Sequence, residues 1–251
     1  MQELKAGSLL QGGKYYIEEV LGQGGFGITY LAMMKNSVKG NLGGMFVRIP
    51  VVIKEFFMES FCQRIDERNV TVPSTGSKKQ AEYFRKEFIK EAHHTSELSH
   101  PNIVKVIEVF EENGTVYYVM EYLKGGSLRQ LIDSQGPLPE SQAVIYVRQI
   151  AKALGYMHKN ANRYHLDVKP SNIMLNDDGQ ARLIDFGLSK GFKKNGRVTS
   201  TGAVIGLSPG FSPLEQYENK LIKISPQTDW FSYKTRWGNE SFSQVKTTYS
   251  I

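Results

Sequence analysis

A short polar loop near the middle of the chain holds several residue types that can catalyse group transfer. Residues 162–174 read NRYHLDVKPSNIM, and His165, Asp167, Lys169 and Asn172 lie within eight residues of one another. An aspartate can accept a proton, a lysine can neutralise an anion, and an amide oxygen suits a hard cation. Such a loop is either solvated or catalytic, and the rest of the sequence must decide between these two interpretations.

A glycine cluster near the N-terminus suggests a phosphate-binding turn. LGQGGFGITY, residues 21–30, contains Gly22, Gly24 and Gly27 in the pattern G-x-G-x-x-G. The dinucleotide-binding form of this pattern is followed at once by a helix. Here β-prone residues follow, so the pattern favours a glycine-rich turn between two strands, whose backbone N–H groups could close over phosphates. An ordinary glycine-rich hairpin fits the cluster equally well.

A carboxylate on the apolar face of a predicted helix needs a partner. The helix is expected over residues 81–98, where Glu91 shares a face with Phe84 and Phe88. Burying an unpaired carboxylate is costly. Lys54 interrupts the apolar strand VVIKEFF, so we expect these two side chains to pair. The alternative is that both extend to solvent.

The wider pattern predicts an α+β fold in which a β-rich region precedes an α-rich one. Asn113-Gly114 marks a hairpin, and a helical apolar stripe follows Pro139. The expected strands lie at residues 15–22, 26–34 and 46–57, and the expected loops at 35–44 and 58–80.

Composition limits the class of protein. The chain has 251 residues, of which 40% are hydrophobic and 22% charged, as in ordinary globular proteins. The single cysteine, Cys62, excludes an internal disulfide and suits a reducing compartment. No apolar run is long enough to span a membrane and the N-terminus lacks a signal-peptide pattern, so we expect a cytoplasmic protein. The net charge is +6, but Lys and Arg are scattered, and no nucleic-acid partner is expected.

Taken together, the motifs resemble those of the protein kinase family over residues 15–229. The phrases GQGGFGITYLA and HLDVKPSN are similar to those of bacterial members of the eukaryotic-like serine/threonine kinases. The motifs occur in the family's order: the glycine turn at 22–27, Lys54, Glu91, His165-Leu166-Asp167 with Asn172, Asp185-Phe186-Gly187, and Ser212-Pro213-Leu214-Glu215 in place of A-P-E.

The resemblance implies a two-lobed, kinase-like α+β fold. Residues 1–120 would form an antiparallel, β-rich N-lobe with one main helix, and residues 121–229 a partial, α-helical C-lobe. SPQTD, residues 225–229, resembles the start of the helix that anchors the family's C-lobe. The atypical polar tail at 230–251 does not continue that helix, so we interpret the chain as truncated or frameshifted after residue 229. A short divergent tail is the alternative, and reading the coding DNA in its other frames distinguishes the two.

The resemblance also implies transfer of the γ-phosphoryl group of ATP, with Mg²⁺, to Ser and Thr hydroxyls of protein substrates. Asp167 would orient the hydroxyl and accept its proton, Lys169 would neutralise γ-phosphate charge, and Asn172 and Asp185 would hold Mg²⁺. Lys54, fixed by Glu91, would hold the α- and β-phosphates. His165 is expected to pack rather than to act as a base. The other ATP-binding residues implied are Leu21, Gly22, Gly24, Gly25, Phe26, Gly27, Met120, Glu121, Leu123 and Ser127.

The sequence departs from the family pattern around the activation segment, which includes Thr199, Ser200, Thr201, Ser208 and Glu215. Leu166 replaces the arginine that normally pairs with a phosphate there. We therefore expect activity that does not depend on phosphorylation of residues 199–201. Ser208 stands near the place of the family's threonine. A non-catalytic, nucleotide-binding module remains an alternative, and a small-molecule kinase is disfavoured because residues 187–215 resemble a protein-substrate platform.

Overall fold

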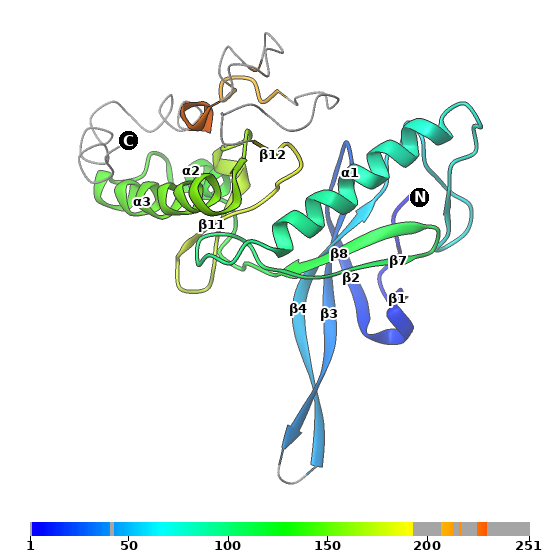
Figure 1. Cartoon of the computed structure of the whole chain (residues 1–251). Coiled ribbons are helices and arrows are strands. Elements are labelled where there is room, and N and C mark those ends of the chain that lie inside the picture. Colours follow the sequence, from blue (N-terminus) through cyan, green and yellow to red (C-terminus); the bar gives the residue numbers. More distant parts are fainter. Residues whose placement is uncertain (1, 41–42, 193–206, 213–215, 217–224, 230–251) are drawn as a thin grey trace. The chain divides into compact units, whose positions relative to one another are not determined.

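The computed structural model describes residues 2–40, 43–192, 207–212, 216 and 225–229 (Figure 1). The chain divides into two compact units, each described separately below. Unit 1 consists of Met1–Glu97 and Lys105–Tyr122, and unit 2 of Leu98–Val104 and the chain from Leu123 onward. The sequence alone places one boundary at residue 120 and gives no sign that residues 98–104 belong with the later part. They do so because Val104 N donates to the carbonyl of Leu183, 3.0 Å away.

A six-stranded antiparallel sheet forms most of unit 1. The strand order is β1-β2-β3-β4-β8-β7. A second, two-stranded sheet pairs β5 with β6. The elements of unit 1 are β1 (Leu9–Leu10), the 3-10 turn η1 (Gln11–Gly13), β2 (Tyr15–Gly24), β3 (Gly27–Gly40), β4 (Gly43–Phe56), β5 (Gln63–Arg64), β6 (Val70–Thr71), α1 (Lys78–Ser96), β7 (Val106–Glu112) and β8 (Thr115–Glu121).

The β3–β4 hairpin is longer than the sequence predicts. Residues 35–44 were expected to be a loop, but β3 and β4 stay paired as far as Gly40 and Gly43. Pairing of β2 with β3 ends at Met34, so the hairpin continues beyond the other strands as a two-stranded ribbon (Figure 1). The loop prediction is wrong because cross-strand pairing outweighs the turn-prone composition of this segment.

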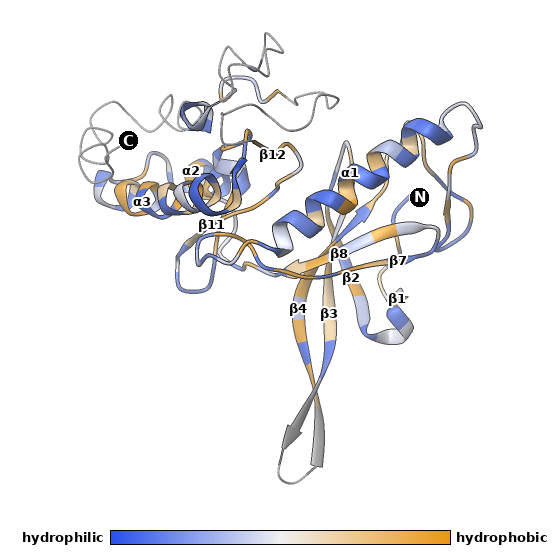
Figure 2. Ribbon diagram, viewed as in Figure 1, coloured by the Kyte–Doolittle hydropathy of each residue, from blue (hydrophilic) through white to orange (hydrophobic). Residues whose placement is uncertain are grey.

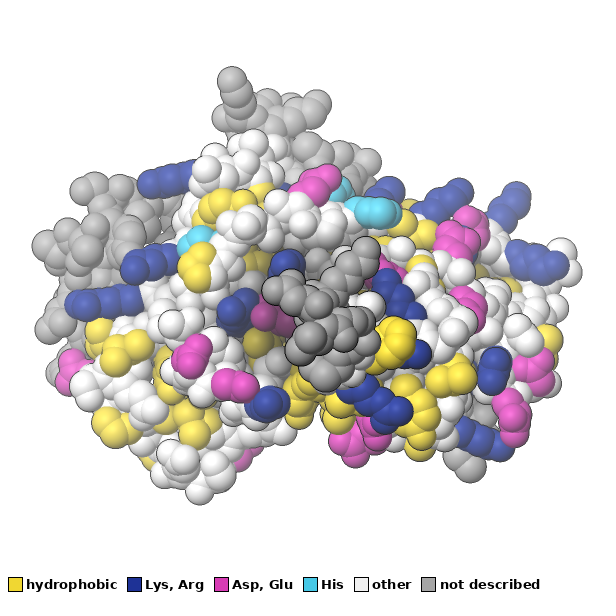
Figure 3. Space-filling view, turned by 90° about the horizontal axis from the view of Figure 1, so that it is seen from below, with side chains coloured by type: hydrophobic (Ala, Val, Ile, Leu, Met, Phe, Trp, Pro, Cys, Tyr) yellow, Lys and Arg dark blue, Asp and Glu magenta, His cyan; other side chains and the backbone are white. Residues whose placement is uncertain are grey.

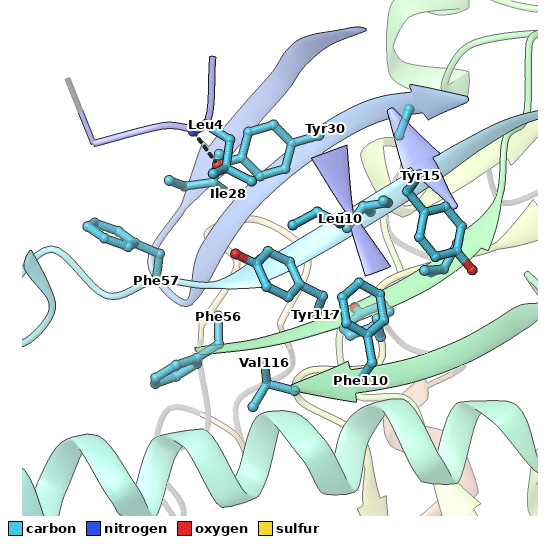
Figure 4. Close-up of a cluster of buried hydrophobic side chains, with 14 of the residues drawn as sticks. Leu4, Leu10, Tyr15, Ile28, Tyr30, Phe56, Phe57, Phe110, Val116 and Tyr117 are labelled. Carbon is cyan, nitrogen blue, oxygen red and sulfur yellow. Dashed lines mark hydrogen bonds between the residues drawn. The ribbon is translucent and has the colours of Figure 1, made fainter. Parts of the chain in front are cut away.

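The two faces of the large sheet are covered by different parts of the chain. Phe56 and Val116 lie toward α1, whereas Leu4 and Tyr30 lie on the opposite side (Figure 4). Phe56 packs on the ring of Phe88 from α1, with ring centroids 5.6 Å apart. On the other side the backbone N–H of Leu4 donates to the hydroxyl of Tyr30 at 3.1 Å. The N-terminal segment therefore covers the face that α1 leaves open.

A buried ion pair holds the β5 segment to this second face. Arg64 Nη2 lies 2.7 Å from Glu55 Oε2, and both side chains are almost fully buried. The hydroxyls of Tyr30 and Tyr117 also donate to the Glu55 carboxylate, at 2.7 Å and 2.9 Å. Burial raises the pKa of Glu55, and the Arg64 charge opposes that shift. Because the carboxylate has three donors, its burial is compensated by hydrogen bonds.

Within the described residues, unit 2 combines helices with short strands. The predicted helix after Pro139 is confirmed, and its apolar stripe is buried; Figure 2 shows apolar residues recurring along α3. The elements of unit 2 are α2 (Leu128–Gln135), α3 (Glu140–Tyr156), the π-helical turn η2 (Met157–Ala161), β9 (Arg163–Tyr164), the 3-10 turn η3 (Pro170–Asn172), β10 (Ile173–Leu175), β11 (Ala181–Leu183) and β12 (Lys190–Gly191).

The surface shows no single basic stripe on the face seen in Figure 3. Lys and Arg side chains lie there at separate places, with Asp and Glu side chains among them. Within the described residues, every helix is too short or too polar to cross a membrane.

Candidate active site

The glycine cluster forms the predicted turn between two strands. Gly24 pairs with Gly27 at the end of the β2–β3 hairpin, and the turn itself consists of Gly25 and Phe26. A methyl group added at Gly25 would meet no atom within 4 Å, whereas one added at Gly27 would lie 2.1 Å from the Glu55 carbonyl oxygen. Gly27 is therefore required for close packing on β4, and Gly25 leaves the backbone accessible.

Two apolar side chains, one within this turn and one before it in β2, are exposed. Leu21 and Phe26 are each 46% exposed. The Phe26 ring lies 5.8 Å from the ring of Phe84 on α1. Gly22 lies in β2 opposite Thr29, and a side chain there would also meet open space. All these residues belong to unit 1, and their predicted role in ATP binding is compatible with an open backbone.

The expected pairing of Lys54 with Glu91 is present in unit 1. Lys54 Nζ lies 3.5 Å from Glu91 Oε1, and both side chains are largely buried. The hydroxyl of Tyr118 donates to the same Glu91 oxygen at 3.0 Å. The ammonium group also lies 5.6 Å from the centroid of the Tyr118 ring. Strand β4 thus presents a cation that is fixed by α1 and β8, which is the chemistry required to hold a phosphate.

The residues predicted to contact adenine lie at the end of β8 and just beyond it. Met120 pairs with Val52 of β4, and Glu121 accepts a hydrogen bond from the N–H of Lys105. Leu123 is buried and begins the second segment of unit 2. Ser127 is the N-cap of α2, because its hydroxyl accepts a hydrogen bond from the N–H of Gln130.

In unit 2, the polar loop at residues 162–174 surrounds one carboxylate with donors. Asp167 Oδ2 lies 2.8 Å from Lys169 Nζ and accepts from the amide of Asn172, also at 2.8 Å. The Ser208 hydroxyl donates to Asp167 Oδ1 at 2.5 Å and accepts from Lys169 Nζ at 2.9 Å. The loop is therefore organised around Asp167 rather than solvated.

Asn172 and Asp185 offer oxygen ligands of the kind Mg²⁺ prefers. Asn172 uses its NH₂ group on Asp167, which leaves its amide oxygen as an acceptor. The Asn172 carbonyl accepts from the N–H of Ile184 at 2.9 Å, which brings the residue before Asp185 beside Asn172. Asp185 has φ of 60° and is exposed. This donor set fits a magnesium ion.

A second aspartate, which the sequence did not single out as a site residue, holds the backbone of the polar loop. Asp229 is fully buried. Its carboxylate accepts from the N–H of His165 at 2.9 Å and from the N–H of Leu166 at 2.7 Å, and His158 Nε2 lies 2.8 Å away. Because Asp229 lies 64 residues beyond His165, no local pattern could have connected them.

His165 packs inside unit 2, as expected. Its Nε2 lies 3.2 Å from the Ile184 carbonyl, its Nδ1 accepts from the N–H of Asp167, and its ring meets Phe186 edge-on. Complete burial lowers the pKa of His165, although the negative charge of Asp229 opposes this shift. A neutral, doubly hydrogen-bonded imidazole suits a structural role.

The Leu166 side chain is also buried, and it packs with Leu188, Phe192 and Tyr164. This position therefore offers an apolar contact where a phosphate-binding arginine would be charged. Ser208 and Ser212 are joined by a hydrogen bond from the N–H of Ser208 at 2.9 Å. The predicted residues Thr199, Ser200, Thr201 and Glu215, and the tail at 230–251, lie outside the described residues.

Comparison with known proteins agrees with this geometry. Residues 61–234 match the family model described as "Protein kinase domain". A probable serine/threonine-protein kinase of Clostridium acetobutylicum is 31% identical over 220 residues, which are 88% of this chain and 28% of the relative. The serine/threonine-protein kinase PknB of Mycobacterium leprae is 37% identical over 130 residues, or 50% of this chain and 21% of PknB.

A solved structure supports the same assignment at the level of the fold. The apo form of PpkA-294 has a TM-score of 0.69 and 26% sequence identity, covering 93% of this chain and 76% of that one. The chain spans about a quarter of the length of the curated relatives it matches. The family model alone covers more than half of the chain. The chain therefore belongs to the protein kinase family, with bacterial serine/threonine kinases among its relatives.

Proposed function

We propose that this protein transfers the γ-phosphoryl group of ATP to Ser and Thr hydroxyls of protein substrates. The observation that carries the proposal is the Asp167 carboxylate in unit 2, held by Lys169, Asn172 and Ser208. The Ser208 hydroxyl donates to Asp167 Oδ1, and Lys169 Nζ lies 2.9 Å from the oxygen of that hydroxyl. A substrate hydroxyl needs this pair of neighbours.

In the proposed reaction, the substrate hydroxyl oxygen attacks the γ-phosphorus and the bond to the β-phosphate oxygen breaks. Asp167 orients the hydroxyl and accepts its proton, and Lys169 counters charge on the migrating group. In unit 1, Lys54 binds phosphate oxygens and Glu91 fixes its position. Asn172 and Asp185 would hold Mg²⁺, which when bound neutralises phosphate charge.

The test compares phosphoryl transfer by the wild-type chain with that by Asp167→Asn. The substrates are a generic basic protein and the chain itself, with labelled ATP and magnesium. Because the variant cannot accept the proton, we expect transfer to fall about a hundredfold or more. Asp178→Asn removes an exposed carboxylate in the same unit and should leave transfer unchanged.

Nucleotide binding is measured in parallel, by the rise in melting temperature on adding ATP and magnesium. Asp167→Asn should keep this rise, because it alters neither Lys54 nor Glu91. Equal transfer by the wild type and Asp167→Asn would refute the proposal. If even the wild type transfers nothing while ATP still raises its melting temperature, the chain binds nucleotide without catalysis, and the proposal also fails.

A further inference from the structure

The ribbon formed by the outer parts of β3 and β4 has no role in the active site described above. Strand β2 pairs with β3 only as far as Met34, and β8 pairs with β4 only from Val51 onward. Beyond these residues the two strands pair only with each other (Figure 1). A two-stranded ribbon is only marginally stable in water by itself, so a binding partner would stabilise this one.

One face of the ribbon continues an exposed apolar row of the sheet. Leu9 of β1 lies opposite Tyr16 of β2, and the row continues across β3 and β4 through Met33 and Pro50. Side chains two residues apart in a strand lie on the same face, so the face extends along both strands of the ribbon. We call it the ribbon face and define it by Leu9, Tyr16, Lys35, Phe46 and Arg48.

The apolar members of the ribbon face are open to solvent. Phe46 is 64% exposed, more than any other large apolar side chain in the part of the chain that the structure describes. Leu9 is 43% exposed and Tyr16 is 37% exposed. Contiguous exposed apolar side chains of this kind mark a surface that binds another molecule.

The charged members of the ribbon face repel one another. Lys35 lies directly opposite Arg48, and like charges at such a cross-strand position are destabilising. Residues 33–53 contain two lysines and one arginine but no aspartate or glutamate. Neither Lys35 nor Arg48 forms an ion pair with any described residue. An anion that binds between them would remove the repulsion.

Aromatic rings hold both cations at the surface. Lys35 Nζ lies 4.0 Å from the centroid of the Phe46 ring, and Arg48 Cζ lies 5.9 Å from the centroid of the Tyr16 ring. At these distances each cation is attracted to the face of its ring. The ribbon face therefore presents cations and apolar groups side by side, in a fixed arrangement.

Two features disfavour a further strand or a flat macromolecule as the partner. Pro50 lacks an N–H group, and proline and lysine in an edge strand discourage the addition of another strand. Ile49, on the opposite face of the ribbon, is also 37% exposed. A peptide or a nucleic acid would cover one face and leave this side chain in water, whereas the headgroup layer of a membrane surrounds an element that enters it.

We propose that the ribbon face binds the surface of a membrane that contains anionic lipids. The rings of Tyr16 and Phe46 would lie at the level of the headgroups, where aromatic side chains are favoured. Lipid phosphates would contact Lys35 and Arg48. The unpaired backbone groups at the ribbon edges would stay among polar headgroups, because the hydrocarbon core cannot satisfy them. The proposal does not depend on phosphoryl transfer.

The test measures sedimentation of the full chain with lipid vesicles, without ATP. One set of vesicles contains phosphatidylcholine alone, and the other contains equal parts of phosphatidylcholine and phosphatidylglycerol. We expect the chain to sediment with the anionic vesicles and to stay in solution with the neutral ones. Added NaCl should release it, because salt screens exposed charges. Sedimentation with neither set, or equally with both, would overturn the proposal.

Chain variants then locate the surface. Lys35→Glu combined with Arg48→Glu should weaken binding to the anionic vesicles about tenfold or more, because two attractive charges become repulsive. Lys79→Glu combined with Lys105→Glu makes the same change in charge at exposed positions of unit 1 outside the ribbon and should bind as the wild type does. Equal weakening by the two pairs would contradict the proposal.

The apolar contribution is tested separately at Phe46. Phe46→Ala should weaken binding about fivefold or more, because burial of the ring is lost. In Phe46→Trp, the fluorescence should shift to shorter wavelength when anionic vesicles are added. Ile145→Trp, at an exposed position of α3 in unit 2, should show no such change, and the absence of a shift in Phe46→Trp would count against insertion of the ribbon.

A nucleic-acid competitor separates a lipid surface from a general polyanion surface. If single-stranded DNA displaces the chain from the vesicles and binds Phe46→Ala as tightly as the wild type, the ribbon face recognises charge alone and the proposal fails. Asp167→Asn must bind the vesicles as tightly as the wild type does. A failure of catalysis therefore leaves this result unchanged.

Discussion

His165 connects the protonation of a single residue to the stability of the protein. Burial lowers the pKa of its imidazole in the folded state, so the folded chain resists protonation there, whereas the unfolded chain takes up a proton below pH about 6.5. Stability from this group is therefore complete above that pH and is lost as the pH falls.

We predict that the free energy of unfolding decreases between pH 7.5 and 5.5, by at most about 1.4 kcal/mol per pH unit from this residue. Urea titrations at several pH values measure it. His165→Gln should show a shallower dependence on pH than the wild type. His93→Gln, at an exposed position on α1, serves as the control, and identical slopes for the wild type and His165→Gln would contradict the prediction.

The role of a single residue could be predicted from the sequence when a charge in one apolar segment implied an opposite charge in another. Lys54 and Glu91 were both out of place in apolar segments, and the ion pair between them is present. Asp229 carries no such signal, because it accepts from the backbone N–H groups of His165 and Leu166. The three donors to Glu55 come from separate segments of the chain: Tyr30, Arg64 and Tyr117. Their importance becomes visible only when the fold brings those donors together.

At the scale of elements, the β2–β3 turn contains one glycine that is required for close packing, Gly27, and one that is not, Gly25. We predict that Gly27→Ala destabilises unit 1 by about 1–3 kcal/mol, because the added methyl group would overlap the Glu55 carbonyl. Gly25→Ala meets no neighbouring atom and should change stability by less than about 0.5 kcal/mol.

Thermal or urea unfolding of the two variants tests this contrast. ATP affinity should follow the same order, since displacement of Glu55 also moves the adjacent Lys54 on β4. Equal stability of Gly27→Ala and Gly25→Ala would mean that the strands separate at little cost and that the close approach is not required.

The loops at 35–44 and 58–80 show where prediction of elements from the sequence failed. Both segments are rich in Gly, Lys, Asn or Ser, which is typical of loops. In the structure, part of each pairs as strand, because unpaired backbone groups of a neighbouring strand were available. The composition of one segment does not show which strand it will pair with. The extension of the β3–β4 hairpin and the β5–β6 hairpin were therefore both missed.

At the scale of the whole molecule, the expected regulation follows from Leu166. Its buried, apolar position offers no cation to a phosphorylated activation segment. We predict that replacing Thr199, Ser200 and Thr201 together by Ala leaves phosphoryl transfer within about threefold of the wild type, because no charge-assisted contact is lost. Transfer rates on the generic basic protein measure this, and loss of activity in the triple variant would contradict it.

The order of the motifs along the chain predicted the family and the α+β class, because each motif constrains the next. The division into two units was harder to predict, because residues 98–104 join unit 2 through backbone bonds to β11. The truncation inferred from the polar tail concerns residues outside those described, and it stays a prediction for the coding sequence to decide.

The position of Asp229 in the sequence also determines how late during synthesis the backbone of the polar loop gains its acceptor. A ribosome that adds about 5–20 residues per second needs roughly 3–13 seconds to travel from His165 to Asp229, which are 64 residues apart. Throughout that interval the nascent chain already contains Asp167, Lys169 and Asn172 but lacks the acceptor for the N–H groups of His165 and Leu166. The polar loop is therefore synthesised before the carboxylate that accepts from its backbone N–H groups.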